Sequence, residues 1–116
     1  TKDKRWKNQF EFIEIPKDVK PSFMVLPILL NKKFAHKKKI FIDTLEKLGI
    51  ETRPIISGSF VNQPSAKLYK LNKKKEIFRG AQLVQDLGFV IGLHTKKLKI
   101  DILKKINDAL FSINKI

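Results

Sequence analysis

Three residues that could bind or transform a ligand lie in one short stretch of the chain. The stretch 49–60 reads GIETRPIISGSF and contains Arg53, Ser57 and Ser59. Because Arg53 precedes a proline, its backbone is restricted to extended conformations, and an extended arginine can aim its guanidinium at a carboxylate or phosphate. The pattern is compatible with an anion-binding loop. On the chemistry of the residues alone, an ordinary helix-to-strand connection with a solvated arginine is the favoured interpretation, since most arginines are surface residues.

His94 is the fourth candidate. It ends the apolar segment FVIGLH at 89–94, and ligand-contacting residues often lie where a rigid element gives way to a loop. The alternative is a histidine that only caps the strand by bonding to its backbone. His36 has no other metal-ligating residue near it in sequence and is expected at the surface. No Gly-rich phosphate loop, HExxH or GxSxG motif is present, so we expect no catalytic residues, cofactor-binding residues or metal ligands in this chain.

The periodicity of apolar residues predicts the scaffold that holds these side chains. Alternation over 10–15 predicts a strand, and the apolar run 22–30 predicts a buried central strand in which Pro27 requires a bulge or an edge position. Further short strands are expected at 50–54 and 89–94. Helices are expected at 35–48, with Gly49 as a left-handed C-cap, and at 64–70, 81–87 and 99–113. The order predicts an α+β fold: a two-layer domain, mostly antiparallel sheet with helices on one face.

Length and composition narrow the class of protein. A chain of 116 residues with 42% hydrophobic residues can form one domain with a core. The chain contains no cysteine, which excludes a disulfide, a thiol nucleophile and a thiolate metal site. No run of about 18 apolar residues and no signal peptide is found. We therefore expect a cytoplasmic protein without a membrane partner.

The net charge of +14, from 25 Lys and Arg against 11 Asp and Glu, suggests a polyanionic partner. Only three of the cations are arginines, the residue that dominates specific phosphate and base recognition. One alternative is therefore a small basic α+β module that binds nucleic acid, with its contacts spread over several lysine clusters. The other is that the lysines form a solvated surface, which is our expectation. The clusters are Lys32–Lys33, Lys37–Lys39, Lys73–Lys75 and Lys104–Lys105.

Four blocks of sequence carry a resemblance to a known family. They read PSFMVLPILL (21–30), LEKLGIETRPIISGSF (45–60), NQPSAKLYKLN (62–72) and GFVIGLHT (88–95). In order and spacing they resemble the C-terminal small domain of the DegT/DnrJ/StrS family of nucleotide-sugar aminotransferases, which are pyridoxal-phosphate enzymes of fold type I. The most similar branch holds the GDP-perosamine-type aminotransferases and the GDP-4-keto-6-deoxymannose 3-dehydratase.

The resemblance implies that two domains have different roles. In that family an N-terminal large domain, which this chain lacks, holds the pyridoxal phosphate, and the small domain shapes the pocket for the keto sugar. Residues 1–9 would be the tail of the inter-domain helix, and residues 10–116 the small domain. Arg53, Ser57, Ser59 and His94 would face the substrate, a nucleotide-linked sugar used in cell-surface polysaccharide or deoxyaminosugar biosynthesis. The chain alone would bind no cofactor and be inactive, and the parent enzyme would be a homodimer.

Two positions depart from the family pattern. Ser59 stands where the branch has asparagine, and one hydroxyl replaces the paired donor and acceptor of an amide. Lys99 stands where the family has a threonine that caps the last helix.

Overall fold

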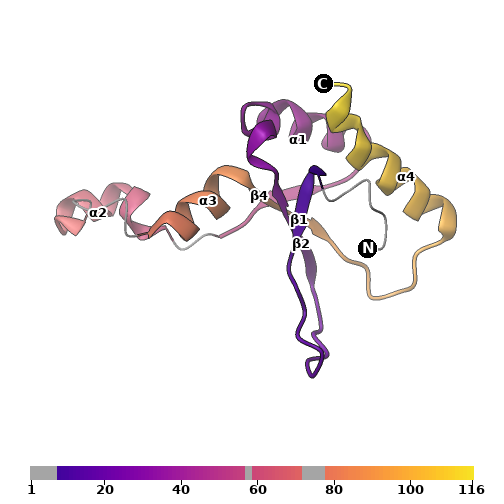
Figure 1. Cartoon of the computed structure of the whole chain (residues 1–116), viewed down its shortest axis with the longest axis horizontal. Coiled ribbons are helices and arrows are strands. Elements are labelled where there is room, and N and C mark those ends of the chain that lie inside the picture. The colour runs from indigo at the N-terminus through magenta and orange to yellow at the C-terminus, as the bar shows by residue number, and fades with distance from the viewer. Residues whose placement is uncertain (1–7, 57–58, 72–77) are drawn as a thin grey trace.

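The computed structural model describes residues 8–56, 59–71 and 78–116 and contains one antiparallel sheet (Figure 1). The strands β1 (Phe10–Phe12), β2 (Val25–Leu30), β4 (Gly88–Gly92) and β3 (Thr52–Pro54) are neighbours in that order. The helical segments are η2 (Lys32–Lys37), α1 (Lys38–Lys47), η3 (Phe60–Asn62), α2 (Pro64–Leu68), α3 (Arg79–Leu87), α4 (Ile100–Phe111) and η5 (Ser112–Asn114). The predicted α+β class with an antiparallel sheet is confirmed. None of the described helices has the length and hydrophobicity needed to cross a membrane.

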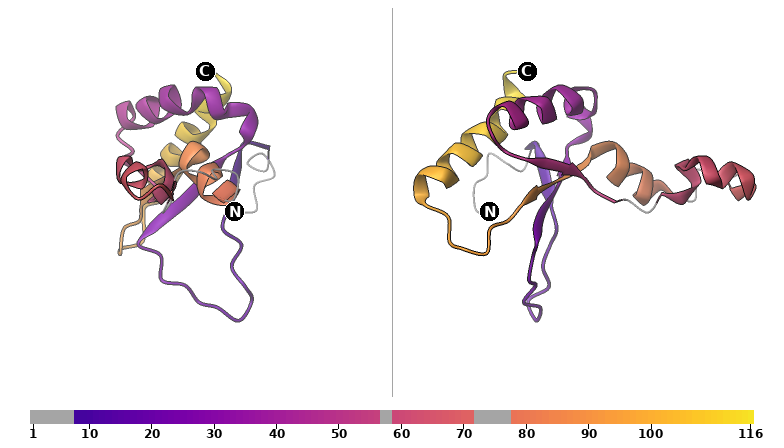
Figure 2. Two further views of the ribbon diagram at one scale, coloured as in Figure 1. Left: turned by 90° about the vertical axis from the view of Figure 1, so that its left-hand side faces the viewer. Right: turned by 180° about the vertical axis from the view of Figure 1, so that it is seen from behind.

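The core lies between one face of the sheet and the pair of helices α1 and α4 (Figures 1 and 2). Alternation places Phe10, Ile28 and Phe89 on this face, and all three are buried. Phe41 of α1 is fully buried against them, with its ring centroid 5.9 Å from that of Phe10 and 6.0 Å from that of Phe89. Leu110 of α4 is also fully buried in this cluster. Burial of these large side chains is the main source of stability available to the fold.

The sequence suggested a bulge or an edge position for Pro27, but β2 is interior to the sheet and pairs with β4 in a continuous register through Pro27. The missing N–H is tolerated for a local reason. The N–H of Asn31 donates to Gln9 on the β1 side, and the period of two places the nitrogen of Pro27 on that same side. However, β1 has already ended, since Phe12 pairs with Ile28. The nitrogen of Pro27 therefore points to the β1 side of β2 at a position that β1 does not reach, so no hydrogen bond of the ladder is lost.

The connection from α1 to β3 follows the predicted turn chemistry. Gly49 has a φ of +80°, the left-handed conformation expected of a helix C-cap. The carboxylate of Glu46 then accepts hydrogen bonds from the backbone N–H of Thr52, at 3.1 Å, and from its hydroxyl, at 2.8 Å. The last turn of α1 thereby fixes the start of β3. The predicted helix at 35–48 is divided, because its first turn has 3₁₀ geometry and belongs to η2.

Two arms leave the body of the molecule in different directions (Figures 1 and 2). The hairpin arm, residues 11–24, joins β1 to β2, and beyond Phe12 it forms no further ladder in the sheet. The α2 arm, residues 59–71, carries η3 and α2 away from the sheet. The predicted strand at 10–15 is therefore too long, and the predicted helix at 64–70 ends at Leu68.

Candidate functional site

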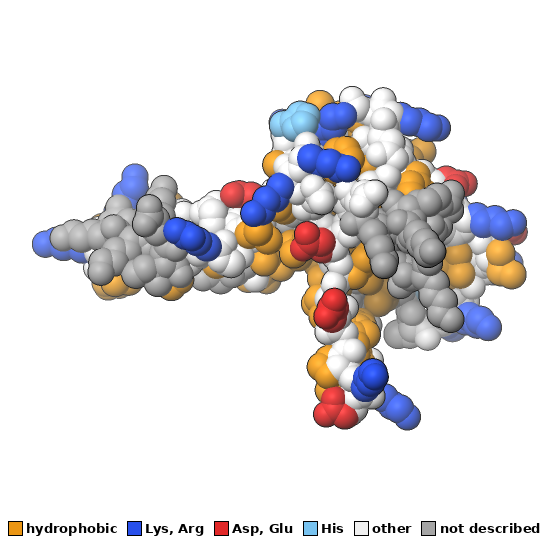
Figure 3. Space-filling view, in the orientation of Figure 1, with side chains coloured by type: hydrophobic (Ala, Val, Ile, Leu, Met, Phe, Trp, Pro, Cys, Tyr) orange, Lys and Arg blue, Asp and Glu red, His pale blue; other side chains and the backbone are white. Residues whose placement is uncertain are grey.

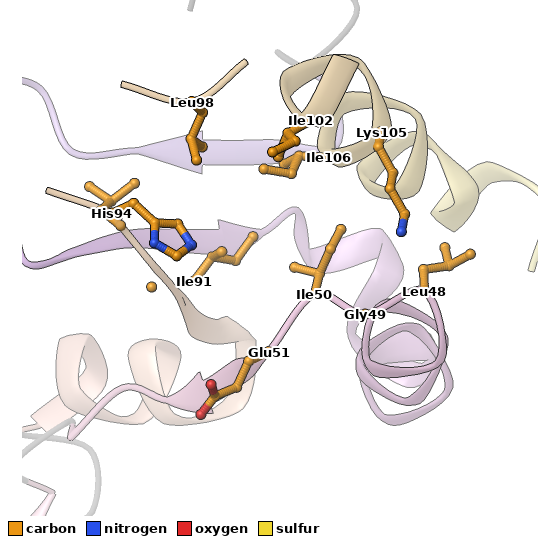
Figure 4. A pocket seen from close by; sticks show the side chains of 12 residues that line it. Leu48, Gly49, Ile50, Glu51, Ile91, His94, Leu98, Ile102, Lys105 and Ile106 are labelled. Carbon is orange, nitrogen blue, oxygen red and sulfur yellow. The ribbon is translucent and has the colours of Figure 1, made fainter. Parts of the chain in front are cut away.

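A pocket of about 470 Å³ opens beside the end of β4, between α4 and the segment 48–51 that leads into β3 (Figure 4). Its walls are mainly aliphatic, and three ionisable side chains border it: Glu51, His94 and Lys105. The aliphatic lining consists of Leu48, Ile50, Ile91, Leu93, Leu98, Ile102 and Ile106. An apolar concavity with a few polar groups is the usual form of a small-molecule site. This "His94 pocket" is therefore the candidate functional site.

The polar groups of the His94 pocket lie at opposite ends of it. In Figure 4 the imidazole of His94 and the ammonium of Lys105 are separated by isoleucine side chains, among them Ile50 and Ile106. The Nζ of Lys105 lies 4.0 Å from the point that a Cβ on Gly49 would occupy, next to the C-terminal end of α1. A cation is favoured there by the helix dipole. The imidazole of His94 can donate or accept a hydrogen bond, and the ammonium of Lys105 can attract an anion.

Arg53 lies on the surface and is already paired. Its Nε and Nη2 donate to one carboxylate oxygen of Glu51, at 3.0 and 2.6 Å, and the two side chains are 75% and 71% exposed. Arg53 pairs with Val90 in the ladder, whereas its neighbours Thr52 and Pro54 pair with the core residues Ile91 and Phe89. Alternation therefore directs Arg53 away from the core. It is connected to the His94 pocket through Glu51, which borders the pocket.

Ser59 is buried, with 5% exposure, and belongs to a different region. Its hydroxyl accepts a hydrogen bond from Nδ2 of Asn62 at 2.8 Å. The same amide donates to Gln82 at 2.8 Å and to Gln85 at 3.1 Å, which ties η3 to α3. Ser59 borders a second pocket, formed with Pro54 and Phe60 among others, and does not border the His94 pocket. Ser57 lies outside the described residues. The other three candidates, Arg53, Ser59 and His94, lie at separate places in the structure.

Two side chains near these elements have shifted pKa values. The pKa of Glu46 lies below its ordinary value because the hydroxyl and the backbone N–H of Thr52 donate to its carboxylate. Burial lowers the pKa of Lys38, and the charge of Asp86 opposes that change. The ammonium of Lys38 donates to the carbonyl of Gln85 at 2.9 Å. Both shifts belong to contacts that hold elements together, α1 to β3 and α1 to α3.

Glu51 and the amide group of Asn62 were not predicted as site residues, and Lys105 was predicted only as part of a lysine cluster. Glu51 could have been found, because residues two apart in a strand share a face and Glu51 is two positions from Arg53. The place of Lys105 in the pocket could not have been found from the sequence, because Lys105 and its neighbour Gly49 belong to distant segments of the chain.

The His94 pocket does not fit pyridoxal phosphate. Its lysine is exposed, and its carboxylate is already bonded to Arg53. Within the described residues, no group of three or more His, Asp or Glu side chains is placed to hold a metal ion.

The chain was also compared with known proteins. No family model, curated protein or solved structure matched it. The family resemblance therefore depends on the four sequence blocks alone.

Proposed function

We propose that this chain is the C-terminal small domain of a pyridoxal-phosphate-dependent nucleotide-sugar aminotransferase, or of a related sugar 3-dehydratase. The cofactor belongs to an N-terminal large domain outside this chain. The chain itself shapes the part of the cleft that receives the keto sugar. The product enters cell-surface polysaccharide or deoxyaminosugar biosynthesis.

One observation carries the proposal. Three of the blocks that resemble the family, 21–30, 45–60 and 88–95, contain β2, β3 and β4. These strands are direct neighbours in the sheet, in the order β2, β4, β3. Segments that lie side by side in a sheet can contribute residues to one site, whereas segments on unrelated surfaces cannot. This arrangement supports the family resemblance of the three blocks.

The residues can act in two ways on an anionic sugar nucleotide. His94 borders an apolar pocket and can hold or move a proton at its imidazole. The guanidinium of Arg53 is exposed and can bind a phosphate if the anion competes with Glu51. Pyridoxal phosphate, when bound in the large domain, supplies the electron sink for chemistry at the keto carbon.

The test begins with the gene. We expect the reading frame to continue about 250 residues upstream, the size of a further large domain. The full-length protein should bind pyridoxal phosphate and act on a nucleotide-linked keto sugar, whereas the 116-residue chain should show no cofactor absorbance.

The chain provides a matched pair of histidines for the test, since His94 and His36 are both exposed. His94→Ala should lower kcat/KM of the full-length protein about tenfold or more, the loss expected for one charge-assisted hydrogen bond. His36→Ala should leave kcat/KM within about twofold of wild type, because it is remote from the pocket and most surface substitutions are near neutral. Absence of a cofactor-binding region upstream, or equal effects of the two substitutions, would contradict the proposal.

A further inference from the structure

Lys105 carries a positive charge that no described residue neutralises. Its helix holds two carboxylates within about one turn, Asp101 on the N-terminal side and Asp108 on the C-terminal side, and residues at these spacings are neighbours on a helix surface. Among the described residues, however, neither carboxylate forms an ion pair with Lys105. The ammonium instead lies near Gly49, at the border of the His94 pocket. The charge is therefore available to an anion that enters the pocket.

The walls of the pocket beside this ammonium are aliphatic and partly open to solvent. Ile50 and Ile91 are buried, whereas Ile102 remains 44% exposed. Because Ile102, Lys105 and Ile106 are three and four positions apart on α4, one face of the helix presents both the charge and the apolar side chains. Figure 4 shows the ammonium beyond the isoleucines, on the side away from His94. The pocket thus combines an apolar middle with a cation at one end.

The chemistry of the walls limits what can occupy the pocket. A sugar carries hydroxyl groups around its ring, and each hydroxyl that leaves water without a new partner weakens binding. The aliphatic side chains in the middle of the pocket offer no such partner, and the ionisable side chains only border it. The sugar of the proposed function can therefore meet His94 at the end of the pocket but does not match its interior. A matching ligand has an apolar body and one anionic end.

We propose that the His94 pocket binds a medium-chain aliphatic carboxylate, with its carboxylate at the ammonium of Lys105 and its hydrocarbon chain along the isoleucines. The volume of about 470 Å³ lies in the range of small-molecule sites. The negative half charge at the nearby end of α1 opposes an anion, but the full charge of the ammonium is larger. This inference does not rest on the proposed enzymatic function, which uses neither Lys105 nor the aliphatic walls.

A side chain from another domain matches the pocket less completely than a free aliphatic acid. A leucine or phenylalanine would cover the apolar walls but leave Lys105 unpaired. An aspartate or glutamate would pair with Lys105, but its short side chain would leave most of the apolar wall exposed to water. A free aliphatic acid supplies the anion and the apolar body in one molecule, so it satisfies both features of the pocket at once.

A series of saturated carboxylates tests the proposal on the 116-residue chain. Isothermal titration calorimetry at neutral pH, below the concentrations at which the acids aggregate, should give a Kd that falls about fourfold for each methylene added from hexanoate upward, until the walls are covered. Octanol should bind about fivefold or more weakly than octanoate, because it has no charge to pair with Lys105 and an exposed ion pair contributes up to about this factor.

Three variants locate the carboxylate and the chain. Lys105→Met removes the charge and keeps an unbranched apolar stem, so octanoate and octanol should bind this variant equally. Lys104→Met changes the net charge by the same amount but does not border the pocket, and should keep the preference for octanoate. Ile102→Asn should weaken both ligands about fourfold or more, because it removes apolar contact. Circular dichroism should show unchanged helix content, since all three side chains are exposed.

Three results would overturn the proposal. A wild type that binds neither octanoate nor decanoate would leave the pocket to a protein segment, such as the proposed large domain. A preference for octanoate that survives in Lys105→Met, or that Lys104→Met abolishes equally, would show that the overall positive charge attracts the acid. Methyl NMR shifts on titration with octanoate should appear at Ile102 and Ile106, and shifts confined to the exposed Met24 and Leu68 of the arms would place the ligand elsewhere.

Discussion

At the scale of single residues, the Arg53–Glu51 pair is the feature best suited to bind an anionic ligand. A guanidinium that already donates two hydrogen bonds to one carboxylate is held in one orientation. Because both side chains are mostly exposed, the pair itself contributes only about 0–1 kcal/mol to stability. An incoming phosphate can therefore displace Glu51 at small cost. The pair orients Arg53 without locking it away from a ligand.

If Arg53 binds an anionic group of the substrate, its removal should weaken the proposed full-length enzyme. Arg53→Ala should lower kcat/KM by roughly 10- to 150-fold, the value of one charge-assisted hydrogen bond to an anion. Arg53→Lys should recover only part of the loss, because it keeps the charge but not the planar fork. Lys39→Ala, an exposed cation on α1, is the control and should change little. A value for Arg53→Ala within about twofold of wild type would identify Arg53 as an ordinary solvated arginine.

Glu46 gives a prediction about pH and stability. Its pKa in the folded protein is lower than its ordinary value of 4.5, because Thr52 donates two hydrogen bonds to the carboxylate. The carboxylate therefore contributes stability above pH 4.5, and this contribution is lost as the pH falls through the lowered pKa. The midpoint of thermal unfolding should be lower for Glu46→Gln than for wild type at pH 7, and the difference should shrink on acidification.

The control for this experiment is Asp43→Asn, on the same helix and exposed. Its substitution should not reproduce the change with pH. A constant difference between Glu46→Gln and wild type from pH 7 to acid would mean that the shape of the side chain matters and its charge does not.

At the scale of elements, the two glycines of β4 have opposite roles. Gly88 joins α3 directly to β4, and a Cβ there would collide with the carbonyl oxygen of Val84 and crowd a methyl of Ile55. At Gly92, the other end of the strand, a Cβ would meet no atom within 4 Å beyond its chain neighbours, and φ is not positive. Within the described residues, nothing approaches the backbone closely at Gly92. Close packing is the reason for a glycine only at Gly88.

We predict opposite effects of the same substitution at these positions. Gly88→Ala should destabilise the chain by about 1–3 kcal/mol, as overpacking does. Gly92→Ala should be neutral or stabilise it by up to about 1 kcal/mol, because it restricts the unfolded chain without a clash. Urea denaturation of the 116-residue chain measures both changes. Equal destabilisation by the two variants would show that the α3–β4 junction can relax around a methyl group.

Sequence predicted the elements whose signals are local. The periodic apolar residues of α1 and α4 and the glycine at position 49 lie within one helix or its cap, so neighbours in sequence suffice to fix them. The ends of the strands are decided by pairing. The sequence predicted a strand over 10–15, but Ile13 and Ile15 are out of phase with Phe10 and Phe12, and the ladder with β2 ends at Phe12 and Ile28. Strand boundaries therefore needed the structure.

The candidate site was predictable only in part for a related reason. The position of His94 at the end of an apolar strand was visible in the sequence, and the pocket lies there. Ser59 is held by a hydrogen bond from the amide of Asn62, which also bonds to Gln82, 20 positions further along the chain. A polar side chain in a small loop can serve such a network or a ligand equally well, and the sequence does not distinguish the two uses.

At the scale of the whole molecule, the positive charge is distributed rather than focused. Lys32 and Lys33 lie on η2, Lys104 and Lys105 lie on α4, and Lys67 and Lys70 lie on the α2 arm. Figure 3 shows cations on both arms and on the body, with carboxylates between them. The lysines at 73–75 lie outside the described residues. A surface that reads a nucleic-acid sequence instead concentrates arginines and polar groups on one element that can enter a groove.

Binding of nucleic acid by this chain should therefore be weak and independent of sequence. Contacts made by scattered lysines release counterions, so the affinity for a labelled duplex of about 20 base pairs should fall about 10³-fold between roughly 50 and 200 mM salt. Fluorescence anisotropy with two unrelated sequences of equal length should give the same Kd. Substitution of Lys32 and Lys33 by glutamate should weaken binding about as much as substitution of Lys104 and Lys105, because each pair supplies only charge. Tight binding to one sequence that survives about 200 mM salt, or loss of binding with only one of these pairs, would instead favour a dedicated nucleic-acid interface on that element.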